Sequence, residues 1–361
     1  MPTRYDLDRD ALADLLEGEP RYRVDQVWQG LHEQLAEPSE MTNLPKALRR
    51  RLDDELPWAL ERVTSSVSDD GDTVKELWEL HDGTRIETVL MHYPERTTVC
   101  ISSQAGCAMA CGFCATGQAG FDRHLTVGEI VEQVVAAART ARPRRVSNVV
   151  FMGMGEPLAN YDHVLAAVRR LNTDLGIGAR HLTISTVGVV PGIRRLAAEG
   201  LQVGLAVSLH VATDEQRDEL VPINRRYPLR ELADACREWM AAQHRRLSFE
   251  WAMIDGVNDT PADAAALAEY ALPLRAHVNL IPLNPTPGWP TTGSSPEVIR
   301  RFRDLLTERG VNATIRRNRG TSIDAACGQL RAGNEVTLLP RRQPSDDDHR
   351  SGPAGWQTVG R

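Results

Sequence analysis

Apolar residues recur at helical spacing through the first part of the chain. One stripe lies within YRVDQVWQGLHEQL and comprises Val24, Val27, Trp28 and Leu31, and a second follows in LPKALRRRLDDEL. The pattern then changes to Val- and Thr-rich alternation, with DDGD and HDGT as turn formers. We therefore expect a helical accessory domain over residues 1–60, followed by a β-hairpin extension over residues 61–95.

Further along the chain, short apolar segments alternate with amphipathic stretches long enough for a helix. The apolar segments are TVCIS, VSNVVF, HLTIST, VGLAVSLH, LSFEWAMI, HVNLIPL and NATIRR. Thr126 and Glu129 form a capping box at the start of the first intervening helix. This rhythm predicts an α/β fold, a partial (β/α)6 TIM-type barrel over residues 96–335 with its functional groups at the C-terminal ends of the strands. Residues 336–361 have charges and turn formers without a period, which predicts a disordered tail.

Composition and charge restrict the class of protein further. The chain has 361 residues, of which 42% are hydrophobic and 25% charged, enough to bury the core of one barrel and an accessory unit. No apolar run approaches the ~20 residues of a membrane helix, and the acidic start lacks the layout of a secretory signal. We therefore expect a cytoplasmic protein without membrane contact. The net charge of -7 argues against holding nucleic acid by bulk charge, so RNA contacts would depend on local Arg clusters.

Cysteine spacing points to metal or redox chemistry. A reducing compartment keeps thiols free, so we expect no disulfide framework among the six cysteines. Cys107, Cys111 and Cys114 form a C-x3-C-x2-C group, and three thiolates hold one side of a metal centre while leaving a ligand position open. A structural zinc site is the lesser alternative, because the sequence offers no second C-x2-C or H-x3-H pair to complete it.

The other three cysteines differ in their surroundings. Cys236 lies on the apolar stripe of a predicted helix, which favours inert core. Cys100 lies on the strand before the C-x3-C-x2-C group, where a small buried hydrophobe is an equal alternative to a reactive thiol. Cys327 lies in a Gly- and Ser-containing loop after the last strand, which favours reactivity. Cys100 and Cys327 could therefore meet across the mouth of the barrel.

The C-x3-C-x2-C spacing after a first barrel strand, with Phe113 before its last cysteine, resembles the radical S-adenosylmethionine (SAM) superfamily. The resemblance implies that Cys107, Cys111 and Cys114 hold one 4Fe-4S cluster and that SAM occupies the remaining iron. It also implies that the reduced cluster cleaves SAM to methionine and a 5′-deoxyadenosyl radical, while the protein supplies orientation and a water-poor site.

Polar residues at other predicted strand ends fall where a SAM site would need them. In GMGEP, which follows VVF, the glycines permit close backbone approach and Glu156 can accept a hydrogen bond from the SAM amino group. Ser185, Ser208 to His210 and Asn284 end three further strands. Each of these residues by itself is more typical of a strand-end turn than of a ligand.

Several longer motifs narrow the resemblance to the RlmN family of RNA methyltransferases that modify carbon 2 of adenine. They run from about residue 23 to about residue 331 and are RVDQVW, CISSQAGCAMACGFCATG, FMGMGEPLANYD, LTISTVGVVP, AVSLHVATDEQRDELVPIN, NLIPLNP and IRRNRGTSIDAACGQL. The resemblance implies a SAM site lined by Gly155, Glu156, Ser185, Ser208, Leu209, His210 and Asn284. It also implies that Cys327 carries the methyl group, that Cys100 is its redox partner, and that Glu87 transfers a proton.

The same resemblance implies substrates and partners. The targets would be an adenosine in the peptidyl-transferase region of 23S rRNA and the adenosine 3′ of the anticodon in tRNA, with two SAM molecules used per turnover. We expect a monomer and an electron donor such as flavodoxin or ferredoxin. The N-terminal helical domain and the Arg-rich segments are candidate RNA contacts; these segments are 49–51, 142–145, 224–226 and 315–320. A solvated charged face is the alternative for each segment and is favoured for 142–145.

Two rival activities stay open at this point. A relative methylates carbon 8 of the ribosomal adenine with the same cysteines. A non-catalytic iron-sulfur RNA sensor would not need Cys100, Cys327 or Glu87.

Overall fold

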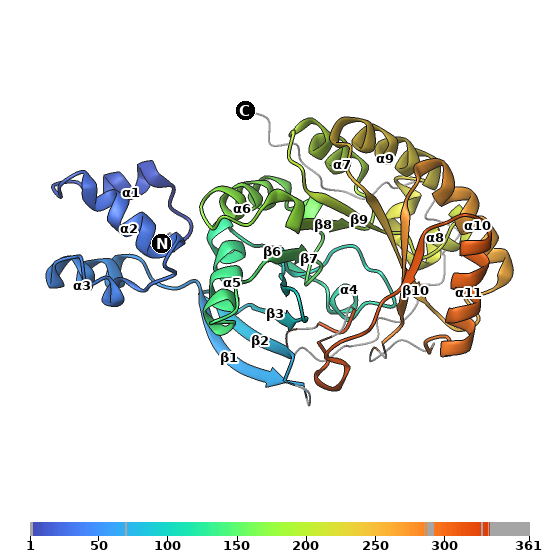
Figure 1. The fold of residues 1–361 in the computed structure, drawn as a ribbon, viewed down its shortest axis with the longest axis horizontal. Helices are drawn as coiled ribbons and strands as arrows, with labels where there is room; N and C mark the ends of the chain where they lie inside the picture. Colours follow the sequence, from blue (N-terminus) through green and yellow to red (C-terminus); the bar gives the residue numbers. More distant parts are fainter. Residues whose placement is uncertain are drawn as a thin grey trace, which may run out of the picture.

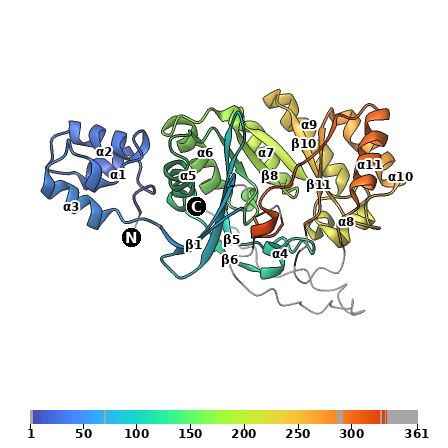
Figure 2. The same ribbon diagram turned by 60° about the horizontal axis from the view of Figure 1, so that its bottom comes forward.

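The computed structural model describes residues 3–68, 71–284, 286, 292–325, 328–330 and 332. Within these residues, ten strands form one mixed sheet in the order β1-β2-β3-β4-β7-β8-β9-β10-β11-β12. Figures 1 and 2 show three N-terminal helices set to one side of this curved sheet, while the later helices cover its outer surface. No helix in the described part of the chain is long and apolar enough to span a lipid bilayer.

The N-terminal unit contains one helix more than the two apolar stripes predicted. Its helices are α1 (Arg9–Leu15), α2 (Tyr22–His32) and α3 (Lys46–Glu55). The added helix α1 is capped at its N-terminus by Asp8, whose side chain accepts a hydrogen bond from Ala11 N at 2.8 Å. The unit is joined to the barrel through Asp6, whose Oδ1 accepts a hydrogen bond from Gly128 N at 2.8 Å.

The β extension is a three-stranded antiparallel sheet, and the prediction of a single hairpin was wrong. The strands β1 (Leu60–Val67), β2 (Thr73–Leu80) and β3 (Arg85–His92) pair in sequence order. Strand β1 is the one beyond a two-stranded hairpin; all but its first residue are exposed or half-buried, so its Val and Thr content gives it no apolar face. The extension continues into the barrel, since β3 pairs antiparallel with β4.

The main sheet confirms the predicted partial barrel. Each of the seven apolar segments contains one strand: β4 (Thr97–Cys100), β7 (Asn148–Phe151), β8 (Leu182–Thr186), β9 (Gly204–Ser208), β10 (Leu247–Met253), β11 (His277–Pro282) and β12 (Ala313–Ile315). Neighbouring strands in this series are parallel. The crossovers contain α5 (Val127–Thr140), α6 (Tyr161–Thr173), α7 (Val190–Ala198), α8 (Asp214–Leu220), α9 (Leu229–Gln243), α10 (Pro261–Ala271) and α11 (Pro296–Glu308). Among the described strands β12 ends the sheet opposite β1, so the barrel is open.

A small ribbon that the sequence did not reveal follows β4. The antiparallel strands β5 (Gln104–Gly106) and β6 (Phe121–His124) enclose the short helix α4 (Ala115–Ala119) and the C-x3-C-x2-C segment. The ribbon fixes both ends of that segment, because Cys107 N donates a hydrogen bond to Gly120 O at 2.6 Å.

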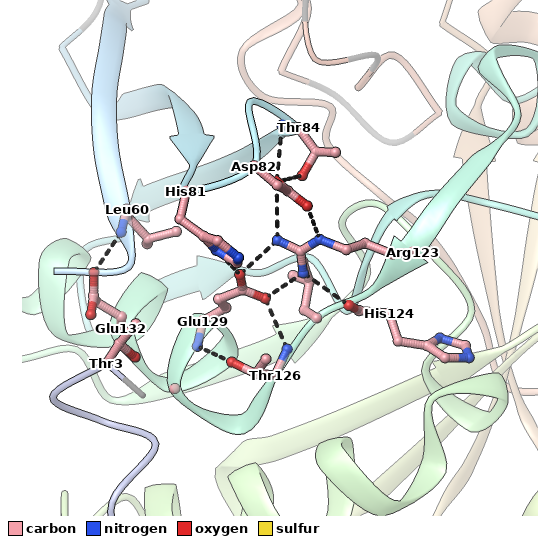
Figure 3. Close-up of polar contacts among 12 residues, drawn as sticks. Thr3, Leu60, His81, Asp82, Thr84, Arg123, His124, Thr126, Glu129 and Glu132 are labelled. Atoms are coloured by element: carbon pink, nitrogen blue, oxygen red, sulfur yellow. Dashed lines mark hydrogen bonds and ion pairs between the residues drawn. The ribbon is translucent and has the colours of Figure 1, made fainter. Parts of the chain in front are cut away.

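An ion-pair cluster joins the extension, the ribbon and the first crossover helix (Figure 3). Arg123 on β6 pairs with Asp82 in the β2–β3 turn at 2.5 Å and with the buried Glu129 of α5 at 2.8 Å. The predicted capping box is present, since Thr126 Oγ1 accepts a hydrogen bond from Glu129 N and Glu129 Oε2 accepts one from Thr126 N. Tertiary contacts therefore hold the extension against the start of the barrel.

Two cysteine predictions can be compared with the fold directly. Cys236 is fully buried on α9, which confirms its assignment to the core. Cys327 and the predicted tail over residues 336–361 lie outside the described residues.

Candidate active site

A pocket lies at the C-terminal ends of the parallel strands, where the barrel predicts its functional groups. We call it the cysteine pocket. Nine of the predicted site residues line it: Cys107, Cys111, Cys114, Gly155, Glu156, Ser185, Ser208, His210 and Asn284. They come from the ribbon loop and from the ends of four strands of the barrel. The fold thus brings together residues that lie far apart in the sequence.

The three thiols of the cysteine pocket suit a metal cluster. Burial raises the pKa of Cys107 to about 12 and raises that of the fully buried Cys111 well above its ordinary value. Such thiols ionise only when a cation replaces the proton. In the described part of the chain, no group of three His, Cys, Asp or Glu is placed to hold a single metal ion. The three-thiol donor set fits the cysteine side of an iron-sulfur cluster.

Glu156 presents a fixed carboxylate in the same pocket. Its Oε1 accepts a hydrogen bond from Leu158 N at 3.0 Å, and its Oε2 accepts one from Val187 N at 2.8 Å. Burial raises the pKa of Glu156 to about 7, although these hydrogen bonds favour the carboxylate. A ligand with an ammonium group would compensate the buried charge, so Glu156 fits the amino end of SAM.

The backbone at Gly155, next to Glu156, accommodates only glycine without strain. Its φ angle is +102°, and a Cβ there would lie 2.6 Å from Cβ of Gln104. The close approach lets Gln104 Oε1 accept a hydrogen bond from Glu156 N at 2.8 Å. The glycine therefore allows the turn that points Glu156 into the pocket.

His210 enters the pocket from the end of β9. Its backbone is left-handed, with φ +61°, and its Nδ1 accepts a hydrogen bond from Ala252 N at 3.0 Å. Burial, assisted by the charge of Arg217, lowers the pKa of His210 to about 3, so the ring is neutral. The ring of Phe113 packs edge-on against it at 4.6 Å between centroids. His210 is therefore an uncharged wall residue held beside the cysteine loop.

Of the other residues predicted at strand ends, Ser185 and Asn284 line the cysteine pocket and Leu209 does not. Ser185 Oγ donates a hydrogen bond to Phe151 O at 2.5 Å, and Asn284 Oδ1 accepts one from Asn318 Nδ2 at 2.7 Å. Leu209 does not line the pocket, because its side chain is fully buried in the core. Its backbone N donates to Glu250 O at 3.0 Å and fixes the turn that carries Ser208 and His210.

Two charged residues in or under the pocket were missed by sequence reasoning. Glu250 on β10 lines the pocket and accepts hydrogen bonds from Ser248 Oγ and Asn279 Nδ2. A carboxylate inside the apolar segment LSFEWAMI was an available signal for it. Arg217 is fully buried and donates to the carbonyls of Val187 and Leu209, so it holds the ends of β8 and β9 together. The polar helix DEQRDEL gave no sign of that burial.

A second pocket contains Cys100 and adjoins the first. We call it the Cys100 pocket. Both pockets share Met152, Arg316 and Leu330 as wall residues, and Ala325 also lines the Cys100 pocket. Gly328 lines the cysteine pocket. The sequence position of Cys327 thus lies between residues of two adjoining pockets.

Glu87 is buried but lines neither of these pockets. Its Oε1 pairs with Lys75 Nζ at 3.0 Å, and its Oε2 accepts a hydrogen bond from Ala332 N at 3.0 Å. Glu87 therefore contacts the main chain at Ala332, five residues after Cys327 in the sequence.

Comparisons with known proteins agree with this geometry. Residues 101–269 match the family model of the radical SAM superfamily, and residues 5–56 match that of the ribosomal RNA large subunit methyltransferase N-terminal domain. A curated relative from Salinispora tropica, named probable dual-specificity RNA methyltransferase RlmN, is 53% identical over 328 residues, covering 87% of this chain and 88% of the relative. A relative of the same name from Rhodococcus erythropolis is 49% identical over 356 residues, covering 92% and 96%.

One solved structure is similar over nearly the whole chain. The crystal structure of a radical SAM methyltransferase from Sphaerobacter thermophilus has a TM-score of 0.89 and 51% sequence identity, covering 92% of this chain and all of that one. The radical SAM match implies a 4Fe-4S cluster and SAM as cofactors, and the donor set of the cysteine pocket fits them. The chain belongs to the RlmN family of radical SAM RNA methyltransferases.

Proposed function

We propose that the protein methylates carbon 2 of adenosine in 23S rRNA and in tRNA, with Cys327 as the methyl carrier and Cys100 as the thiol that releases the product. The observation that carries the proposal is the shared wall between the cysteine pocket and the Cys100 pocket. One pocket gathers three thiols and Glu156, and the other contains a further thiol. The dual specificity in the names of the relatives supports both RNAs as substrates.

The chemistry of the target explains why two kinds of sulfur site are needed. Carbon 2 of adenine is electron-poor and has no lone pair, so it cannot attack a sulfonium methyl group directly. When bound, the cluster supplies the electron that cleaves SAM and generates a carbon radical. The apolar wall of the cysteine pocket, which includes Met109, Phe113 and Val187, excludes water from that step.

The protein's own thiols carry the carbon unit in this scheme. Cys327 Sγ first takes the methyl group of one SAM molecule, as the sulfonium C–S bond breaks and the new S–C bond forms. The carbon radical from a second SAM molecule would take one hydrogen atom from this S-methyl group and end as a closed-shell C–H product. The sulfur-stabilised methylene radical that is left adds to carbon 2. The adduct then loses the carbon-2 proton, with Glu87 as the proton-transfer group, and one electron, which the oxidised cluster, when bound, would take back.

Release of the product requires the second thiol. The Cys100 thiolate attacks the sulfur of Cys327, so that an S–S bond forms while the bond from that sulfur to the base-linked carbon breaks. The departing carbon takes up a proton and becomes the methyl group of the product. A reductant outside the protein then restores both thiols.

The experiment compares the two RNAs separately. Protein reconstituted without oxygen is incubated with SAM, a reductant and a fragment of 23S rRNA or a tRNA, and the nucleosides are identified by mass spectrometry against standards. We expect 2-methyladenosine from both RNAs with wild-type protein and none with Cys327→Ala. Formation of 8-methyladenosine, normal turnover by Cys327→Ala, or RNA binding without any product would refute the proposal.

A second variant tests the release step. Cys100→Ala should accumulate a covalent protein–RNA adduct, because the crosslink loses the thiol that resolves it. The adduct is read as a slow-migrating band on a denaturing gel, with Cys236→Ala as the matched control because that thiol is buried in the core. Absence of the band would exclude Cys100 from this role.

A further inference from the structure

Lys75 is a mostly buried lysine that contacts two distant parts of the chain. It is one of only two lysines in the chain, and its side chain on β2 is 15% exposed. Its Nζ pairs with Glu87 Oε1 at 3.0 Å and donates a hydrogen bond to Asp324 O at 3.2 Å. One ammonium group thus contacts both a carboxylate of the extension and the main chain near the C-terminal end of the barrel.

The contacts of Glu87 extend this connection further along the chain. Glu87 Oε2 accepts a hydrogen bond from Ala332 N at 3.0 Å. Asp324 precedes Cys327 by three residues, and Ala332 follows it by five. The Lys75–Glu87 pair is therefore bound to the chain on both sides of the proposed methyl carrier.

Other contacts place the same segment against the cysteine loop. Gly328 O accepts a hydrogen bond from Ala115 N at 2.8 Å, and Leu330 O accepts one from Thr116 Oγ1 at 2.6 Å. Ala115 and Thr116 follow Cys114 directly in the sequence. The segment is thus held by α4 on the cluster side and by the Lys75–Glu87 pair on the extension side.

The chemistry of the ammonium group suits this double contact. An ammonium has three donors that can point in separate directions, so Lys75 contacts Glu87 and Asp324 at once, whereas a neutral side chain of similar length would remove the ion pair with Glu87. Loss of Lys75 would therefore weaken two anchors at once, the direct one at Asp324 and the indirect one at Ala332.

We infer that Lys75 is a positioning residue for the methyl-carrier step: it fixes Asp324 directly and Ala332 through Glu87, and so holds the segment that contains Cys327 against the cysteine loop. This inference rests on the proposed function in that Cys327 is the carrier. Lys75 does not itself touch SAM or RNA in this role. Its contribution is to the rate at which Cys327 receives the methyl group.

The test measures S-methylation of Cys327 in cluster-loaded protein incubated with SAM and no RNA, by mass spectrometry of the peptide that contains this cysteine. Rates are expressed per cluster, from iron content and the iron-sulfur absorption, and SAM affinity is measured in parallel. Lys75→Met and Lys75→Gln should slow methylation at least tenfold, with cluster content and SAM affinity as in wild type. Lys75→Arg keeps the charge and should recover part of the rate.

The other lysine provides the matched control. Lys46 is exposed at the start of α3, so Lys46→Met should methylate Cys327 at the wild-type rate. A wild-type rate per cluster in Lys75→Met or Lys75→Gln would overturn the inference, as would equal slowing in Lys75→Arg and Lys75→Met. Absence of methylation on Cys327 in wild-type protein would instead refute the proposed function.

Discussion

Replacement of Glu132 by Gln should remove the part of the pH dependence of the unfolding free energy that comes from ionisation of this residue. Glu132 is fully buried on α5, and its Oε1 accepts a hydrogen bond from Leu60 N at 2.8 Å, as Figure 3 shows. Its Oε2 has no hydrogen-bond partner within the described residues. Burial raises the pKa of Glu132 to about 8, and the hydrogen bond from Leu60 together with the charge of Arg4 opposes that rise.

The size and sign of the effect follow from this pKa. The pKa of Glu132 rises from its ordinary value of 4.5 to about 8 in the folded protein. At roughly 1.4 kcal/mol per pH unit, the largest possible effect on the free energy of unfolding is about 5 kcal/mol. Because the folded-state pKa is raised, the stabilising contribution is complete below the ordinary pKa and is lost as the pH rises through the folded value. Between pH ~6 and ~8.5 the wild type should lose about 2–3 kcal/mol relative to a variant that cannot ionise.

Glu132→Gln is that variant, because the amide keeps an oxygen to accept the hydrogen bond from Leu60 N. Urea unfolding of both proteins, followed by far-ultraviolet circular dichroism across the same pH range, gives the difference in unfolding free energy at each pH. We expect the difference to shift in favour of the variant as the pH rises. Glu61→Gln is the matched control, since Glu61 is an exposed carboxylate on the neighbouring strand β1. A wild-type-minus-variant difference that stays constant with pH would refute the reasoning.

Three further predictions test the site and its support. Gly155→Ala should lose SAM binding in equilibrium dialysis, because the added Cβ would lie 2.6 Å from Cβ of Gln104 at φ +102°; wild-type affinity would contradict the assigned turn. Arg123→Leu leaves the buried Glu129 without its guanidinium partner and should lower the free energy of unfolding, measured in urea, by about 3 kcal/mol. A loss below about 1 kcal/mol would mean that the ion pairs of Arg123 do not stabilise the fold. Cys236→Ala should cost about 1 kcal/mol of stability while leaving methylation per cluster unchanged, and lost methylation would place that thiol in the chemistry.

Most strands of the barrel were predictable from the sequence because they contain buried apolar residues; β12, which has no buried residue, is the exception. Parallel strands covered by helices appear as short continuous apolar runs, and all seven such runs contain a strand. The site followed from the same regularity, since strand ends in a parallel sheet meet at one edge. That is why Glu156, Ser185, Ser208 and His210 converge with the cysteine loop although each motif is weak by itself.

The parts that escaped prediction depend on tertiary contacts. Strand β1 is mostly exposed, so its register with β2 rather than its composition makes it a strand. Arg217 stands in a polar helix and is buried only because it donates to carbonyls at the ends of two distant strands. Lys75 has no local pattern that distinguishes it, and its contact with Asp324 spans 249 positions of the sequence.

The open barrel and its antiparallel extension together explain where the second thiol lies. Cys100 is the last residue of β4 and pairs with Val89 of β3 on one side and with Val150 of β7 on the other. It therefore stands at the boundary between the antiparallel extension and the parallel barrel. Because β3 occupies this side of β4, the Cys100 pocket has walls from the extension, from β4 and from the segment after β12. A barrel without the extension would keep the three cysteines of the ribbon loop but would lack Lys75 and Glu87, which contact Asp324 O and Ala332 N.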